Sequence, residues 1–139
     1  MNTKIIRRYG KSRALYDADN KKIIRQKNLP EIVLNENVII YNDEGKDITL
    51  TILLTMLASE EFNKNYKSIL SEKMLMDIIR YSQNELSSFI NIFLEKNLEF
   101  FSEYNSVFDK IIQEKGGEEL FKLLNNFIKA QKELLENYK

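Results

Sequence analysis

The sequence contains no cysteine and no histidine among its 139 residues. Without cysteine the chain cannot form disulfides, thiolate zinc sites or a cysteine nucleophile. Without histidine it lacks the commonest general base at neutral pH and the commonest ligand of transition metals. These absences argue against triad chemistry and metal-assisted hydrolysis. We therefore expect a protein that is not an enzyme and that uses no metal and no cofactor.

Proline occurs once and glycine four times, while 43% of the residues are hydrophobic and 30% are charged. This composition differs from that of disordered or collagen-like chains and suits long helices. No apolar run approaches the roughly 18 residues that a membrane span requires. The chain begins with polar and charged residues, unlike a signal peptide. We expect a cytoplasmic protein with one domain, or one small domain and an appendage.

The charges sum to zero but are unevenly distributed along the chain. The first 30 residues contain nine Lys or Arg and two Asp, a net charge of +7. The remaining residues contain 12 basic and 19 acidic side chains, a net charge of −7. This asymmetry suggests that the amino-terminal end meets a polyanion.

The most distinctive stretch runs from Arg7 to Asp17, with four Lys or Arg, two Tyr and a single acid. Guanidinium groups bind phosphates, and flat rings stack on bases. A solvated β-hairpin surface that binds nothing would have the same composition, so both interpretations remain open on these features alone. The candidate nucleic-acid-binding residues are Arg7, Arg8, Tyr9, Lys11, Arg13, Tyr16, Lys21, Lys22 and Arg25.

Residues 1–62 predict a small α+β head. The segments Lys4–Tyr9 and Lys21–Arg25 predict strands that pair across a turn at residues 17–20. The apolar run Val38–Tyr41 predicts a further strand. A brief helix is expected near Pro30, because proline is tolerated in a first helical turn.

A second helix of the head is predicted from about Leu50 to Phe62, with Asp47 or Thr49 as its cap. The spacing of four leucines predicts the face that covers the sheet. These residues are Leu50, Leu53, Leu54 and Leu57.

Residues 71–139 predict long helices with a coiled-coil or bundle-like arrangement. A helix capped by Ser71 could run for some 40 residues, on the order of 60 Å. Gly116-Gly117 should end it, and a second helix should follow, either as a hairpin or reaching another subunit. Apolar residues at heptad-like spacing predict an oligomerisation seam, although an uncovered seam could instead lie on a hydrophobic boundary. The seam residues are Leu75, Ile79, Leu86, Phe89, Phe93, Phe101, Tyr104, Phe108 and Ile111.

The stretch from Arg8 to Asp17 resembles the opening motif of the polyhydroxyalkanoate (PHB) synthesis regulator family. The similarity continues through Val38–Tyr41 and Gly45–Thr49, and through Leu53-Leu54 to Glu60-Glu61. It persists more loosely to about Ile112. The last helix lies outside the resemblance.

The resemblance implies a bacterial transcriptional regulator, commonly a repressor, with an amino-terminal DNA-binding unit. Members of the family are thought to repress genes for storage-granule coat proteins and to leave DNA when they bind polyester or granules. The positive charge and the interleaved tyrosines agree with DNA binding independently.

We therefore expect a head that binds double-stranded DNA and a helical tail that forms a dimer or tetramer. Polyhydroxyalkanoate polymer or the granule surface is a further expected partner. The alternative is a granule-associated or partner-binding helical protein that has no sequence-specific DNA binding. In that case the basic segment would serve only for solubility or contact a surface.

Overall fold

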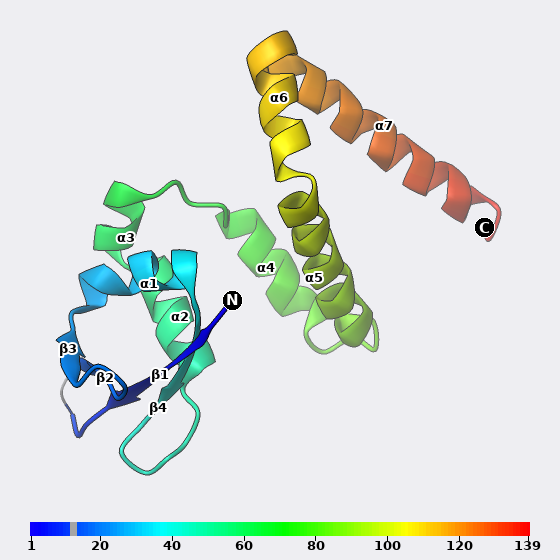
Figure 1. The fold of residues 1–139 in the computed structure, drawn as a ribbon. Helices are drawn as coiled ribbons and strands as arrows, with labels where there is room; N and C mark the ends of the chain where they lie inside the picture. Colours follow the sequence, from blue (N-terminus) through cyan, green and yellow to red (C-terminus); the bar gives the residue numbers. More distant parts are fainter. Residues whose placement is uncertain (12–13) are drawn as a thin grey trace. The chain divides into compact units, whose positions relative to one another are not determined.

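The computed structural model describes residues 1–11 and 14–139. It divides into two compact units, Met1–Met74 and Leu75–Lys139. The first contains a four-stranded sheet and several helices, and the second contains helices (Figure 1). This arrangement confirms the predicted α+β fold class.

The sheet of the first unit has the strand order β3-β2-β1-β4. Its strands are β1 (Thr3–Arg8), β2 (Leu15–Asp17), β3 (Lys22–Ile24) and β4 (Asn37–Tyr41). Strand β1 pairs antiparallel with β2 and parallel with β4. The predicted pairing of residues 4–9 with residues 21–25 is wrong, because β2 lies between them. A strand of three residues is too short to show a two-residue repeat in the sequence.

The first unit also contains one turn of 3-10 helix and three α-helices. These are η1 (Gln26–Asn28), α1 (Leu29–Asn35), α2 (Thr49–Ala58) and α3 (Glu60–Asn65). Pro30 lies in the first turn of α1, as predicted.

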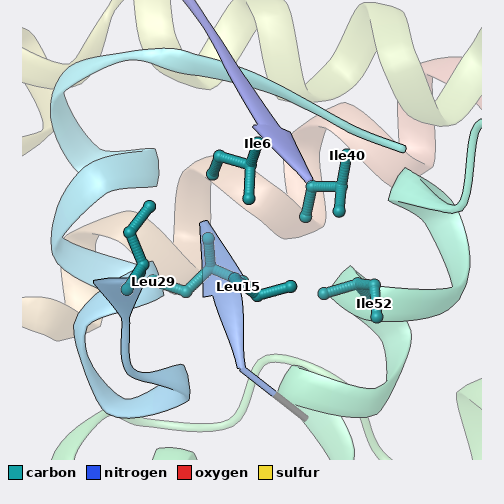
Figure 2. Close-up of a cluster of buried hydrophobic side chains, with 6 residues drawn as sticks. Ile6, Leu15, Leu29, Ile40 and Ile52 are labelled. Atoms are coloured by element: carbon teal, nitrogen blue, oxygen red, sulfur yellow. The ribbon is translucent and has the colours of Figure 1, made fainter. Parts of the chain in front are cut away.

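One face of the sheet carries the hydrophobic core. Each strand contributes one fully or nearly fully buried apolar side chain, and α1 and α2 contribute Leu29 and Ile52. Figure 2 shows side chains of this cluster pointing toward one another from the sheet and the helices. The four strand residues are Ile6, Leu15, Ile24 and Ile40. Helices α1 and α2 therefore cover the same face of the sheet.

The packed face of α2 differs from the predicted leucine face. Ile52 is 7% exposed and Leu53 packs against the core, whereas Leu50, Leu54 and Leu57 are exposed. The prediction is thus correct for Leu53 and wrong for the other three leucines. Ile52 and its neighbours Ile48 and Met56 make the contact instead.

The orientation of α2 is fixed where the helix begins. The hydroxyl of Thr49 accepts a hydrogen bond from the Ile40 amide at 2.8 Å, which ties the first turn to β4. The Asp47 carboxylate accepts hydrogen bonds from the Thr49 amide at 2.9 Å and from its hydroxyl at 2.6 Å. These bonds rotate α2 so that Ile48 and Ile52 face inward.

Helix α2 ends at Ala58, so the predicted continuous helix to Phe62 is also wrong. Ser59 has an extended backbone, and its hydroxyl accepts a hydrogen bond from the Phe62 amide at 3.2 Å. A serine in this position caps a helix, and the following acids Glu60 and Glu61 suit its positive end. These acids begin α3 and do not terminate α2.

The predicted helix of some 40 residues is divided into three. Helix α4 (Glu72–Tyr81) begins after Ser71, whose hydroxyl accepts from the Met74 amide at 3.1 Å, as expected of a cap. It is followed by α5 (Ser87–Glu103) and α6 (Asn105–Lys115). The second helix expected after the glycine pair is α7 (Gly117–Glu136). No helix in the described part of the chain is long and apolar enough to cross a membrane.

Polar side chains explain the break between α4 and α5. The Asn84 side chain accepts a hydrogen bond from the Leu86 amide at 2.9 Å, and the Ser82 hydroxyl donates to the Ile78 carbonyl at 2.7 Å. Side chains that bond to nearby backbone in this way compete with continuous helix. The heptad pattern reflects only the spacing of the apolar residues and contains no information on these local hydrogen bonds.

Helix α7 folds back within the chain. Gly116 has φ +84°, a left-handed conformation that favours glycine at a helix end. The rings of Phe100 in α5 and Phe127 in α7 lie 5.9 Å apart. The hairpin alternative is therefore the one observed.

An ion pair fastens β1 to the β2–β3 hairpin. The Lys4 ammonium lies 2.8 Å from Asp17 and 3.7 Å from Glu36. Asp17 also accepts hydrogen bonds from the backbone amides of Asp19 and Asn20 and from the Asn20 side chain. Burial alone would raise the pKa of Asp17, but the hydrogen bonds from Lys4 and Asn20 outweigh it and hold the pKa well below its usual range.

Replacement of Asp17 by asparagine should destabilise the first unit, because it leaves the Lys4 ammonium without its closest partner. We expect a loss of about 3 kcal/mol at pH 7, measured by urea unfolding. Asp19→Asn, an exposed acid in the same turn, should change stability by less than about 0.5 kcal/mol.

The same variant should alter the pH dependence of stability. Because the folded pKa of Asp17 is depressed, the unfolded state takes up the proton first as the pH falls below about 4. The free energy of unfolding of the natural sequence should therefore decrease in this range, and it should decrease less for Asp17→Asn. Equal acid sensitivity in both proteins would contradict a stabilising role for the Asp17 carboxylate.

The observed orientation of α2 predicts that truncating two nearby apolar side chains lowers stability by very different amounts. Ile52→Ala removes a buried side chain and should cost about 2–4 kcal/mol of unfolding free energy. Leu54→Ala truncates a side chain that is 52% exposed and should cost less than about 0.5 kcal/mol. Urea unfolding of both variants checks the expectation, and a larger loss for Leu54→Ala would contradict the rotation of α2.

Candidate nucleic-acid interface

The face of the sheet opposite the core carries a row of aromatic and cationic side chains. In the strand register Arg7 of β1 lies between Tyr16 of β2 and Tyr41 of β4, and Tyr16 lies beside Ile23 of β3. Because successive residues of a strand point to opposite faces, the burial of Ile6 places Arg7 on the other face. We call Ile23, Tyr16, Arg7 and Tyr41 the Tyr–Arg row.

Contacts within the first unit hold this row in place. The Arg7 guanidinium lies 5.7 Å from the centre of the Tyr41 ring, the geometry of a cation–π contact. The rings of Tyr9 and Tyr16 meet edge to face with their centres 6.0 Å apart. Tyr9 is 55% exposed. The row and the adjacent Tyr9 thus combine three aromatic rings with one guanidinium.

The surroundings of the row are apolar. Ile5 of β1 and Ile39 of β4 are register partners on the same face, and both are half-buried. Ile23 is 72% exposed at the end of the row. Helices α1 and α2 cannot cover these side chains, because both pack on the opposite face.

The sheet separates the predicted basic residues into two groups. Arg8, Lys11 and Arg25 lie at the end of the sheet where β1 and β3 finish, which we call the loop end. Lys21 and Lys22 lie at the β2–β3 turn, at the opposite end. Arg25 lies three positions after Lys22 in the chain, a distance of roughly 10 Å along an extended strand. Arg13 lies outside the described residues.

The loop end remains available for an anion. Lys11 and Arg25 are exposed, and neither Arg7 nor Arg8 forms an ion pair with a residue that the structure describes. The Nε atom of Arg8 is buried and has no hydrogen-bond partner within residues 1–11 and 14–139. In contrast, Lys4 is turned into the sheet toward Asp17 and is not available to a ligand.

One hollow in the first unit is smaller than a usual ligand site. A hollow between α1, α2 and α3, lined by Leu29, Met56, Phe62 and Tyr66, has a volume of about 80 Å³. Pockets for small molecules usually measure about 300–1,000 Å³. Among the described residues there is no cluster of three or more acidic side chains that could hold a metal ion.

Tyr41 and Ile23 are the residues of this surface that sequence reasoning missed. The sequence assigns Tyr41 to a strand but does not connect it with Arg7, because the two residues lie 34 positions apart in the chain. The alternation Ile39, Ile40, Tyr41 shows which residues share a face. It does not reveal that β4 pairs in parallel with β1, and that pairing brings Tyr41 to Arg7.

Comparison with models of known protein families finds no match, and comparisons with curated proteins and with solved structures find no similar protein. Function is therefore inferred from the side chains themselves.

Proposed function

We propose that this chain is a DNA-binding transcriptional regulator whose first unit contacts DNA through the Tyr–Arg row and the loop end. The observation that supports this most strongly is the position of Arg7 between Tyr16 and Tyr41 on the face opposite the core, where all three side chains are partly exposed. An arginine fork suits a phosphate, and rings beside it suit sugars and bases. The protein would act in the cytoplasm and without enzymatic activity.

The phosphate contacts are assigned to Arg7 and to the loop end. Lys11 and Arg25 lie at the same end of the sheet as Tyr9, so a DNA backbone passing the row would meet them next. Arg8 pairs with the buried Leu15 and therefore lies on the core face, outside this contact. Lys21 and Lys22 lie at the opposite end and are placed outside this contact. Contacts of this kind supply affinity that decreases as salt increases, because each one releases condensed counterions.

The resemblance to regulators of polyhydroxyalkanoate synthesis supports a narrower proposal. The chain would repress genes for polyester synthesis or for granule proteins, and polymer or granules would draw it off the DNA. In the host organism, chromatin immunoprecipitation should then enrich DNA upstream of storage-granule genes. Enrichment at unrelated genes alone would contradict the polyester assignment and leave DNA binding intact.

DNA binding can be tested with two variants that remove the same charge from opposite ends of the sheet. Lys11→Gln with Arg25→Gln should reduce the slope of log affinity against log salt by about 2 for a 30-base-pair duplex. Lys21→Gln with Lys22→Gln should leave that slope nearly unchanged. Fluorescence anisotropy between roughly 50 and 200 mM salt measures both.

Two results would count against this proposal. Absence of duplex binding even at the lowest salt would contradict DNA binding itself. Equal reductions in slope for the two double variants would contradict the assignment of the contacts to the loop end.

The second unit supports a further proposed role, that of assembling copies of the chain. None of residues 75–139, all of which the structure describes, is buried. Phe89, on the predicted seam, is 63% exposed. The ring centres of Phe101 and Phe108 lie 5.4 Å apart within one chain. Part of the predicted seam therefore makes contacts inside the second unit. A helical unit that buries so little on its own gains stability when a second copy covers its apolar side chains.

The granule-associated alternative rests on the same exposed side chains. Those side chains would then contact polyester or lipid in place of another copy. The two roles differ in the assembly state of the purified protein.

Sedimentation velocity should show a dimer or tetramer for the natural sequence and a monomer for Phe89→Glu, because the charge cannot be buried in an apolar interface. Asn91→Glu adds the same charge two residues along α5 at an exposed polar position and should leave the assembly intact. A natural protein that is monomeric yet partitions onto polyester or lipid particles would contradict self-association and favour the granule-associated role.

A further inference from the structure

The width of the sheet determines which form of DNA can reach the Tyr–Arg row. Adjacent strands lie about 4.8 Å apart, so four strands span about 14 Å between their outer backbones. The major groove of B-form DNA is only about 12 Å wide and admits a helix or a two-stranded ribbon. Tyr16 and Arg7 lie on the two inner strands, β2 and β1. The face of the sheet is therefore too wide to enter that groove, so Tyr16 cannot reach the bases of a closed duplex, and a duplex can offer only its phosphates to Arg7.

We propose that the open face of this sheet binds single-stranded DNA, with unpaired bases stacked on Tyr16 and Tyr41 on either side of Arg7. This inference rests on the proposed DNA-binding function and specifies the form of DNA that the site takes. Aromatic rings on an uncovered four-stranded sheet are a recurrent platform for unpaired bases, because every base has a flat face that can stack.

The spacing of the rings suits an extended strand. Tyr16 and Tyr41 project from strands that are separated by one further strand, which places their backbones about 10 Å apart. Stacked bases along one strand of a duplex follow each other at about 3.4 Å. Two bases that meet these two rings cannot be stacked neighbours, so the bound strand must be stretched across the sheet.

Arg7 occupies the position where the backbone of such a strand would cross. Its guanidinium already lies against the Tyr41 ring at 5.7 Å, which orients it without an acidic partner among the described residues. A phosphate between two stacked nucleotides is the ligand that a planar guanidinium fork binds best.

The two ends of the row indicate the direction in which the strand leaves the sheet. Asp47 pairs with Tyr41 at the β4 edge, and its carboxylate is held by Thr49. A negative group at this edge disfavours phosphate there. Away from this edge, Tyr16 contacts the exposed ring of Tyr9, and the chain continues from Tyr9 to Lys11 at the loop end. The strand would therefore run from Tyr41 over Arg7 and Tyr16 toward Tyr9.

The experiment compares fluorescein-labelled oligo-dT of 15 nucleotides with a 15-base-pair duplex, at one salt concentration and with the full-length protein. The natural sequence should bind the single strand at least about tenfold more tightly. Tyr16→Ala and Tyr41→Ala should each weaken single-strand binding by about tenfold, because each removes one stacking surface. Tyr16→Ala should change duplex binding by less than about twofold, since Tyr16 lies on an inner strand and cannot reach the bases of a duplex.

Matched variants separate stacking from folding. Tyr16→Phe and Tyr41→Phe keep the ring and should bind the single strand like the natural sequence. Tyr138→Ala removes an exposed ring from the end of the second unit and should also have no effect. Arg7→Lys keeps the charge but loses the planar fork, and it should weaken single-strand binding while preserving the salt dependence. Urea unfolding of each variant identifies any that fail to fold.

The chain has no tryptophan, so its ultraviolet emission comes from tyrosine. Oligo-dT should quench this emission in the natural protein and in Tyr138→Ala, and it should quench it less in Tyr16→Ala.

Three outcomes would overturn the inference. Duplex binding as tight as single-strand binding, with no effect of Tyr16→Ala, would remove the stacking site and leave the proposed DNA-binding function standing. Failure to bind either DNA would remove both. Tighter binding of oligo-rU than of oligo-dT would overturn the assignment to DNA.

Discussion

The two-residue repeat of β1 is the constraint on which the first unit depends. Ile6 is fully buried against Leu15 and Ile40, so its neighbour Arg7 must project from the opposite face. A slip of one residue in register would move Arg7 into the core and Ile6 into solvent. The Lys4–Asp17 ion pair opposes such a slip, because it joins β1 to the β2–β3 hairpin at a fixed position. The packing that stabilises the fold therefore also presents the candidate site.

Local signals in the sequence are sufficient for many individual elements. Pro30, the apolar run at β4 and the glycine at residue 116 each determine the conformation of their own segment, and the structure agrees with all three. Features that depend on distant residues could not be predicted in this way. The inward face of α2 depends on the bond between Thr49 and Ile40, and the row contains Tyr41 only because β4 is parallel to β1. The cationic and aromatic segment of the candidate site can thus be predicted from the sequence, but its pairing with β4 cannot.

The two units differ in how completely each buries its own apolar side chains. The first has a small core closed by two helices on one face. The second has an internal aromatic contact between Phe100 and Phe127 but no buried side chain in residues 75–139. An assembly through the second unit would bring several sheets together. Weak contacts between each sheet and one DNA molecule would then act together, since linking binding units raises their effective concentration.

The outer edge of β4 is already occupied by its own chain. At Ile40 the amide donates to the Thr49 hydroxyl at 2.8 Å, and the carbonyl accepts from the Ile48 amide at 2.8 Å. The opposite edge, β3, has only three residues, and it begins with Lys22 directly after Lys21. Unpaired strand edges are the usual starting points for amyloid-like growth, and short, charged or blocked edges prevent it. Copies of this protein can therefore be crowded together without their sheets merging into a fibre.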